Sequence, residues 1–142
     1  MSPYKKYEAY SVATRTVAKT RQVVMLYDGA IRFLKQASIA LNGNRIEERF
    51  NLLSKSAEII IGLQSSIDFD NGGEIANTLH GFYTTITRRI LAINFIKNMH
   101  EGEKQCNEII GDLKQMRDVW ESIDHSLNSN GDANTESGAI SA

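Results

Sequence analysis

The sequence predicts an all-α fold: an antiparallel four-helix bundle with an extended N-terminal arm and a disordered C-terminal tail. Proline occurs only at Pro3, so no later residue lacks the backbone N–H that a helix needs. From residue 22 onward, apolar residues recur at alternating steps of three and four, the period of a helix with one buried face. No segment of useful length alternates with a period of two, so no sheet is expected.

Four stretches carry an apolar seam of this kind. The first seam is formed by Val23, Tyr27, Ala30, Leu34, Ala37 and Leu41. The second is formed by Ile46, Phe50, Leu53, Ala57, Ile60, Leu63 and Ile67. The third is formed by Ile75, Leu79, Phe82, Ile86, Ile90 and Ile93, and the fourth by Cys106, Ile109, Leu113, Met116, Trp120, Ile123 and Leu127. Because the links between these stretches are short, neighbouring helices are expected to run antiparallel and pack into one bundle.

Glycines mark the links and two positions within the helices. Asn42-Gly43-Asn44 is a stop signal at the end of the first seam. Gly72-Gly73 follows the second seam, where we expect glycine in a left-handed turn to end the helix. Glu74 then favours the positive N-terminus of the third helix. Gly29 and Gly81 lie inside helices, which indicates close approach of a neighbouring backbone.

Composition divides the chain into three parts. A length of 142 residues is the size of one domain. Residues 1–17, with three tyrosines, are expected to form an N-terminal arm that packs on the bundle. Residues 18–127 hold the four seams and form the bundle. Residues 128–142 are small and polar with almost nothing to bury, so this tail is expected to be disordered.

Charge and apolar content make nucleic acid and membrane less favoured as partners. The net charge of −1 provides no overall attraction to nucleic acid or to an anionic membrane. Residues 1–21 hold five basic residues against one acidic residue, so nucleic-acid binding by this arm is a weaker alternative. No apolar run is long enough to span a bilayer, and the N-terminus lacks the apolar core of a signal peptide. We therefore expect a cytoplasmic protein without membrane insertion.

The sequence contains no recognisable catalytic or metal-binding motif. The three histidines share no helical spacing suited to a metal, and no Glu-x-x-His pair occurs. Cys106, the single cysteine, lies on the fourth seam and is expected to be a small buried hydrophobe. Asp68 and Asp70 lack the further ligands of a calcium loop. The expectation is therefore a protein that is not an enzyme, with no catalytic residue, cofactor or metal.

Three helices carry more apolar residues than their seams require. These off-seam residues are Val24, Ile31, Phe33, Leu52, Ile59, Ile61, Tyr83, Leu91, Phe95 and Ile96. The simpler interpretation is that a compact bundle buries a stripe broader than a coiled-coil seam. The alternative is an exposed apolar groove that accepts a helix from a partner. Arg88 and Arg89 likewise have two interpretations: solvated residues or partners of acids on a neighbouring helix, or a polar rim of an interface.

Several groups of residues occur in an order and at a spacing that are similar to those of one family. They are Tyr7-Glu8-Ala9-Tyr10, Met25 to Phe33 (MLYDGAIRF), Gly72-Gly73-Glu74-Ile75-Ala76, then Leu79, Tyr83, Arg88-Arg89, Leu91 and Asn94, and finally Trp120. No single group is diagnostic, but the ordered set is specific and covers about residues 4–123. On these residues the chain resembles the FliS-type flagellin export chaperones of bacteria.

This resemblance implies a cytoplasmic chaperone that binds the C-terminal helical region of flagellin, prevents premature polymerisation and assists flagellar type III secretion. Flagellar export components or a second chaperone are further partners that it allows. The residues expected to bind the partner are Tyr7, Tyr10, Val24, Ile31, Leu52, Ile59, Tyr83 and Leu91. The two tyrosines either cover the groove when the partner is absent or anchor the arm elsewhere. The alternative function is a self-associating structural or regulatory bundle.

The chain departs from the family pattern at two places. The family usually begins its first helix with Thr-Ala-Ser-Pro, where this chain has Thr16-Val17-Ala18-Lys19. Thr20 is then a candidate replacement for the missing N-cap. The link at Lys97–Gly102 is about one helical turn longer than the family pattern suggests, which affects the length of the third or fourth helix.

Overall fold

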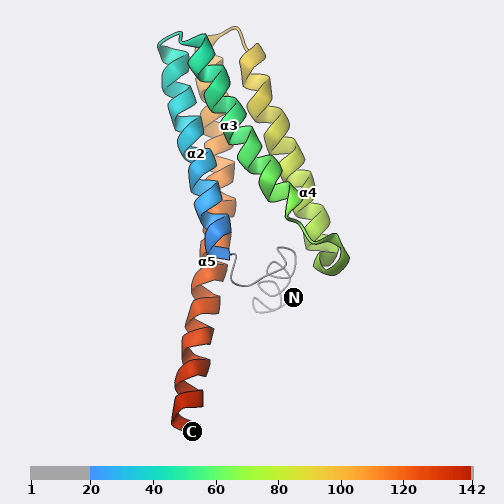
Figure 1. The fold of residues 1–142 in the computed structure, drawn as a ribbon. Coiled ribbons are helices and arrows are strands. Elements are labelled where there is room, and N and C mark those ends of the chain that lie inside the picture. Colours follow the sequence, from blue (N-terminus) through green and yellow to red (C-terminus); the bar gives the residue numbers. More distant parts are fainter. Residues whose placement is uncertain (1–19, 142) are drawn as a thin grey trace.

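The computed structural model describes the backbone of residues 20–141 and the side chains of residues 20–128. These residues form four α-helices and one 3₁₀ turn, with no strand among them. The α-helices are α2 (Thr20–Asn42), α3 (Ile46–Ser65), α4 (Phe69–Ala92) and α5 (Met99–Ser141). The 3₁₀ turn η2 (Ile93–Phe95) lies in the link before α5. Successive helices run in opposite directions, which confirms the predicted antiparallel four-helix bundle (Figure 1).

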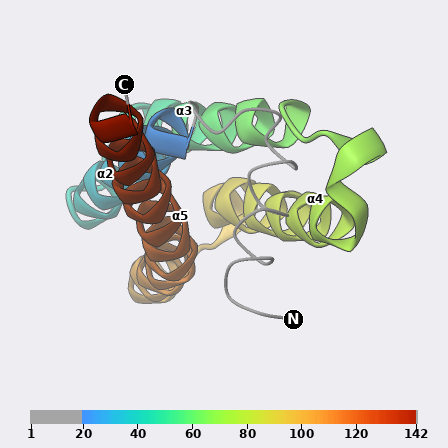
Figure 2. The same cartoon turned by 90° about the horizontal axis from the view of Figure 1, so that it is seen from below.

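The four helices pack unequally. Helix α2 lies between α3 and α5 and packs closely against both, whereas α4 packs on α3 and approaches α5 at few positions. Seen along the bundle, α2 and α5 lie on the side of the molecule away from α4 (Figure 2). The bundle therefore has two outer faces that are far apart, one along α3 and α4 and the other along α2 and α5.

The core confirms most of the predicted seams. Every residue of the first seam is buried, and Trp120 is the largest fully buried side chain of the fourth. The second seam is wrong at its start, because Ile46 is 58% exposed and Phe50 is 56% exposed. Both lie in the first turns of α3, at the end of the bundle where few neighbouring residues cover the helix. Helical period alone does not locate the end of a bundle.

The link between α2 and α3 confirms the predicted stop signal. Helix α2 ends at Asn42, and Asn44 has a φ of 54°, in the left-handed region that asparagine tolerates. The backbone N–H of Arg45 donates to the carbonyl of Ala40 at 2.9 Å, so the turn satisfies a carbonyl at the C-terminus of α2. This tight turn returns α3 along α2.

The glycine pair has a different role from the one predicted. Helix α3 ends at Ser65, and α4 begins at Phe69 with Asp68 as its N-cap. The Asp68 carboxylate accepts from the backbone N–H groups of Asp70 and Asn71 at 3.1 and 3.2 Å. Gly73, at φ 56° and ψ −139°, therefore kinks α4 after its first turn and does not terminate α3. Because Asp68 caps α4 upstream of the glycines, the helix had already started before it reached them.

Replacing Gly73 by alanine is expected to destabilise the protein by about 1–3 kcal/mol, because its backbone conformation is one that L-residues rarely adopt. Gly81→Ala is the control: a Cβ at this exposed position of α4 would contact nothing within 4 Å. That variant should gain about 0.5–1 kcal/mol. Urea denaturation measures both changes, and equal effects of the two substitutions would contradict the kink.

The close backbone approach predicted at Gly81 is wrong, because a Cβ added there would contact nothing within 4 Å. At Gly29 an added Cβ would lie 3.4 Å from the Ile59 side chain, so this glycine packs closely against α3.

The structure describes the two ends of the chain to different extents. The N-terminal arm of residues 1–17 lies outside the described residues. The disorder expected for residues 128–142 stays a prediction; helix α5 is bounded at Ser141, and the side chains of residues 129–142 lie outside the described part of the chain. Leu127, the last residue of the fourth seam, still packs against the core.

Candidate protein interface

The structure distributes the predicted partner-binding residues over several places. Val24 and Tyr83 are buried in the core, where the Tyr27 hydroxyl donates to the Tyr83 hydroxyl at 2.9 Å. Ile31 and Leu52 are also buried, so the broad-stripe interpretation accounts for these four off-seam residues. Six residues of the predicted set are described, and no single face of the bundle gathers them. Tyr7 and Tyr10 lie outside the described residues.

Two predicted residues are accessible, on different faces. Ile59 is half-buried on α3, and its Cδ1 lies 3.4 Å from the position of a Cβ at Gly29 of α2. Leu91 on α4 is 39% exposed. The large exposed apolar side chains include several that sequence reasoning did not place in an interface. They are Met25, Leu26, Ile39, Ile46, Phe50, Ile61, Phe69, Leu91, Phe95 and Met99.

Four of these exposed residues belong to neighbouring parts of α3, α4 and η2. The Gln64 side-chain amide on α3 donates to the Thr84 hydroxyl at 2.7 Å and to the His80 carbonyl at 3.2 Å, which sets the register of α3 against α4. Stepping away by helical turns puts Ile61 and Phe50 on the side of α3 that carries Gln64, and Leu91 on the side of α4 that carries Thr84. Phe95 follows α4 in η2. We call Phe50, Ile61, Leu91 and Phe95 the α3–α4 strip.

The α3–α4 strip has the chemistry of a protein interface. Phe95 is 86% exposed and Ile61 is 46% exposed, so large apolar side chains face water on this side of the bundle. On α3, Phe50 and Ile61 lie on one side of the helix about three helical turns apart, which suits an amphipathic helix laid along the strip. A sequence signal for one member existed: Phe50 closely follows the stop signal at residues 42–44, so it had to lie near an end of the bundle. The register of α3 against α4, set by Gln64 and Thr84, was not visible in the sequence.

Arg88 and Arg89 behave differently. The Arg89 guanidinium binds the Asp112 carboxylate at 2.7 Å and so links α4 to α5. This confirms for Arg89 the interpretation as a partner of an acid on a neighbouring helix. Arg88 is exposed.

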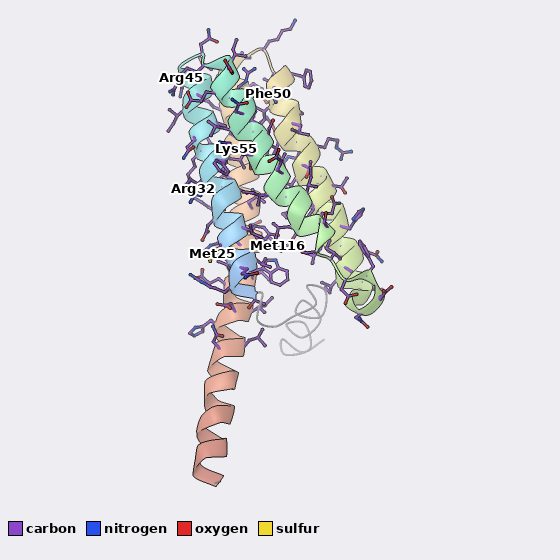
Figure 3. All side chains as sticks on the ribbon, viewed as in Figure 1. Met25, Arg32, Arg45, Phe50, Lys55 and Met116 are labelled. Carbon is purple, nitrogen blue, oxygen red and sulfur yellow. The ribbon has the colours of Figure 1, made fainter. Side chains whose placement is uncertain are left out.

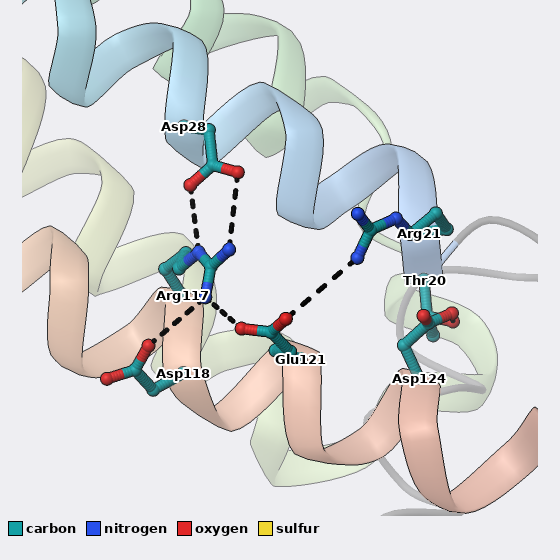
Figure 4. Close-up of polar contacts among 7 residues, drawn as sticks. All are labelled: Thr20, Arg21, Asp28, Arg117, Asp118, Glu121 and Asp124. Carbon is teal, nitrogen blue, oxygen red and sulfur yellow. Dashed lines mark hydrogen bonds and ion pairs between the residues drawn. The ribbon is translucent and has the colours of Figure 1, made fainter.

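An ion-pair network joins α2 to α5 (Figure 4). Arg117 donates from two guanidinium nitrogens to Asp28, at 2.8 and 3.4 Å, and it also binds Asp118 and Glu121. The hydrogen bond with Asp28 raises the pKa of Arg117, so the guanidinium is held in its charged form. About two helical turns away from the contact of Arg117 with Asp28, the Thr20 hydroxyl donates to the buried Asp124 carboxylate at 2.8 Å. These contacts position the first turns of α2 on α5.

The described residues contain no arrangement that suggests chemistry. No group of three or more His, Cys, Asp or Glu side chains in the described part of the chain could hold a metal ion. Cys106 is fully buried, as predicted, and burial raises the pKa of its thiol to about 11, with a smaller contribution from Glu103. At neutral pH this thiol is therefore protonated and a poor nucleophile. No helix among the described residues is long and apolar enough to cross a membrane.

Comparison with known proteins places the chain in a family. A family model described as "Flagellar protein FliS" matches residues 1–127. The chain therefore belongs to the FliS family, which confirms the resemblance seen in the sequence. It is 30% identical over 118 residues to the flagellar secretion chaperone FliS of Campylobacter jejuni, covering 82% of this chain and 89% of that protein. It is also 30% identical over 125 residues to the Salmonella typhimurium FliS, covering 86% of this chain and 90% of that one.

A relative of lower identity also matches most of the chain. The flagellar secretion chaperone FliS of Bacillus subtilis is 28% identical over 119 residues, which cover 84% of each chain. These relatives are named as chaperones and not as enzymes, so the family assigns a non-catalytic role.

Proposed function

We propose that this protein is a cytoplasmic flagellar secretion chaperone that binds the C-terminal helical region of flagellin. In this role it prevents premature polymerisation and assists export through the flagellar type III apparatus. The observation that carries the proposal is the family match over residues 1–127, which includes the whole packed part of the bundle. The named chaperone relatives support it.

The α3–α4 strip is the surface that we assign to flagellin. A flagellin helix that is buried in the filament has an apolar face that must be shielded from water before assembly. Covering about 100 Å² of such apolar surface contributes roughly 2.5 kcal/mol before the cost of ordering the helix. The chaperone thus buries against itself the apolar face that flagellin later buries in the filament, so binding needs no nucleotide. Tyr7 and Tyr10 of the arm stay part of the predicted binding set.

A charge placed on the α3–α4 strip should weaken flagellin binding. Leu91→Asp is expected to raise the dissociation constant for a flagellin C-terminal peptide at least tenfold, because the carboxylate would lose water in the complex. Isothermal titration calorimetry measures the affinity, and circular dichroism should show an unchanged melting temperature. Ile39→Asp is the matched control, since Ile39 is an exposed isoleucine on α2, away from the strip.

The outcomes separate the proposed function from its alternative. Equal weakening by both variants would exclude the α3–α4 strip as the flagellin site. A stable homodimer that does not respond to flagellin, detected by analytical ultracentrifugation, would favour the self-associating module and contradict the chaperone function.

A further inference from the structure

An open depression of about 400 Å³ lies between α2 and α5. Its lining holds four basic side chains, Arg32 and Lys35 from α2 and Lys114 and Arg117 from α5. Ile31, which is only 6% exposed, provides an apolar surface between them. Helices α2 and α5 lie on the side of the bundle away from α4 (Figure 2). None of the residues that line the depression belongs to the α3–α4 strip.

The acids of the depression are already occupied. Its only acidic lining residues are Asp28 and Asp118, and both bind Arg117. Arg117 also binds Glu121, so the network around this guanidinium needs no further anion. The other three bases are exposed, and none of them forms an ion pair within 4.0 Å with an acid of the described chain. Three positive charges on two helices therefore remain uncompensated.

A fourth cation extends this positive surface across α2 onto α3. The Arg32 guanidinium carbon and the Lys55 ammonium nitrogen each lie 5.7 Å from the centre of the Phe33 ring. The negative charge density over the faces of this ring stabilises both cations. Figure 3 shows Arg32 on α2 and Lys55 on the neighbouring α3. We call Lys55, Arg32, Lys35 and Lys114 the basic band.

We propose that the basic band binds an acidic segment of a protein partner other than the one that covers the α3–α4 strip. Arg32 presents a planar fork that matches a carboxylate, and the lysines provide flexible point charges on either side. A helix carrying glutamate or aspartate at successive turns places its carboxylates opposite these cations, with Ile31 available to an apolar side chain. A compact cluster of positive charges selects an acidic partner over a basic one and raises the rate at which the acidic segment associates.

The same features disfavour nucleic acid as the ligand. The band presents no exposed aromatic ring on which a base could stack, because Phe33 is partly buried beneath two cations. The whole chain carries a net charge of −1, so it lacks the long-range attraction that phosphate backbones require. Because the basic band and the α3–α4 strip lie on different faces, the chain can hold two partners at once. The inference does not depend on flagellin being one of them.

Titration of the ¹⁵N-labelled full chain with a short peptide of repeated Glu-Ala-Ala-Glu units tests the proposal by NMR. The amide shifts that change should lie at residues 28–35 and 111–118. The variant Arg32→Ala/Lys35→Ala/Lys114→Ala should bind the peptide about tenfold more weakly at low salt, which is the sum expected of three exposed ion pairs. The control Arg88→Ala/Lys97→Ala/Lys104→Ala removes the same charge from exposed positions outside the depression and should change the affinity less than twofold.

Three results would overturn the proposal. The first is an equal loss of affinity in the two triple variants, which would reduce the effect to net charge. The second is a set of shift changes confined to the basic segment of residues 1–21. The third is tighter binding of a single-stranded DNA of equal charge at the same amides, which would make the band a nucleic-acid surface.

Discussion

Replacing Trp120 by alanine is expected to reduce the free energy of unfolding by about 3–5 kcal/mol. The Trp120 side chain is fully buried on α5 and is the largest fully buried side chain of the described core. Its removal leaves a cavity where α5 meets the rest of the core, and a compact bundle closes such a cavity only partly. Urea denaturation followed by circular dichroism measures the loss.

Ser122→Ala provides the control for Trp120. This serine is exposed two residues further along α5, so its replacement should change stability by less than about 0.5 kcal/mol. A Trp120→Ala protein with normal stability but no affinity for the flagellin peptide would place Trp120 in an interface. It would also mean that the fourth seam is rotated from its observed position.

Two adjacent isoleucines of α3 should separate folding from binding. Ile60 is fully buried, so Ile60→Asp would place a carboxylate in the core and is expected to cost about 5 kcal/mol or more, enough to unfold a marginally stable bundle. Ile61 is 46% exposed on the α3–α4 strip. Ile61→Asp should keep the helical signal in circular dichroism and raise the dissociation constant for the flagellin peptide at least tenfold.

Ile61 is a better probe of the surface than Ile59, one of the residues that the sequence predicts to bind the partner. The sequence placed Ile59 on the flank of its helix, yet its side chain packs against Gly29 and is half-buried. An aspartate at that position would disturb the contact between α2 and α3 as well as any interface. If Ile60→Asp and Ile61→Asp both unfold the protein, or both leave it folded, the assignment of the two residues to core and strip is wrong.

The candidate interface could be predicted only in part. The sequence singled out the off-seam residues as the ones whose location decides whether a binding surface exists. Of the predicted residues that the structure describes, however, only Leu91 is clearly exposed and lies on the strip. Tyr83, which lies off the predicted seam, is buried because Tyr27, 56 residues away in sequence, meets it inside the bundle. Phe50 was assigned to the core because periodicity does not report where the covering helices end.

The sequence by itself determined the four helices, the residues at the centre of their buried faces, and the family to which the chain belongs. It could do so because helical period and stop signals act over a few residues, and the ordered family residues are read directly from the chain. Only the tertiary structure decided which edges of those faces are covered. The pairing of Gln64 with Thr84, and of Arg117 with Asp28 at a separation of 89 residues, depends on the register between helices. That register arises from packing of whole helices. It decides which exposed apolar side chains of α3 and α4 share a face, and it leaves Arg32, Lys35 and Lys114 without an ion pair to an acid of the described residues.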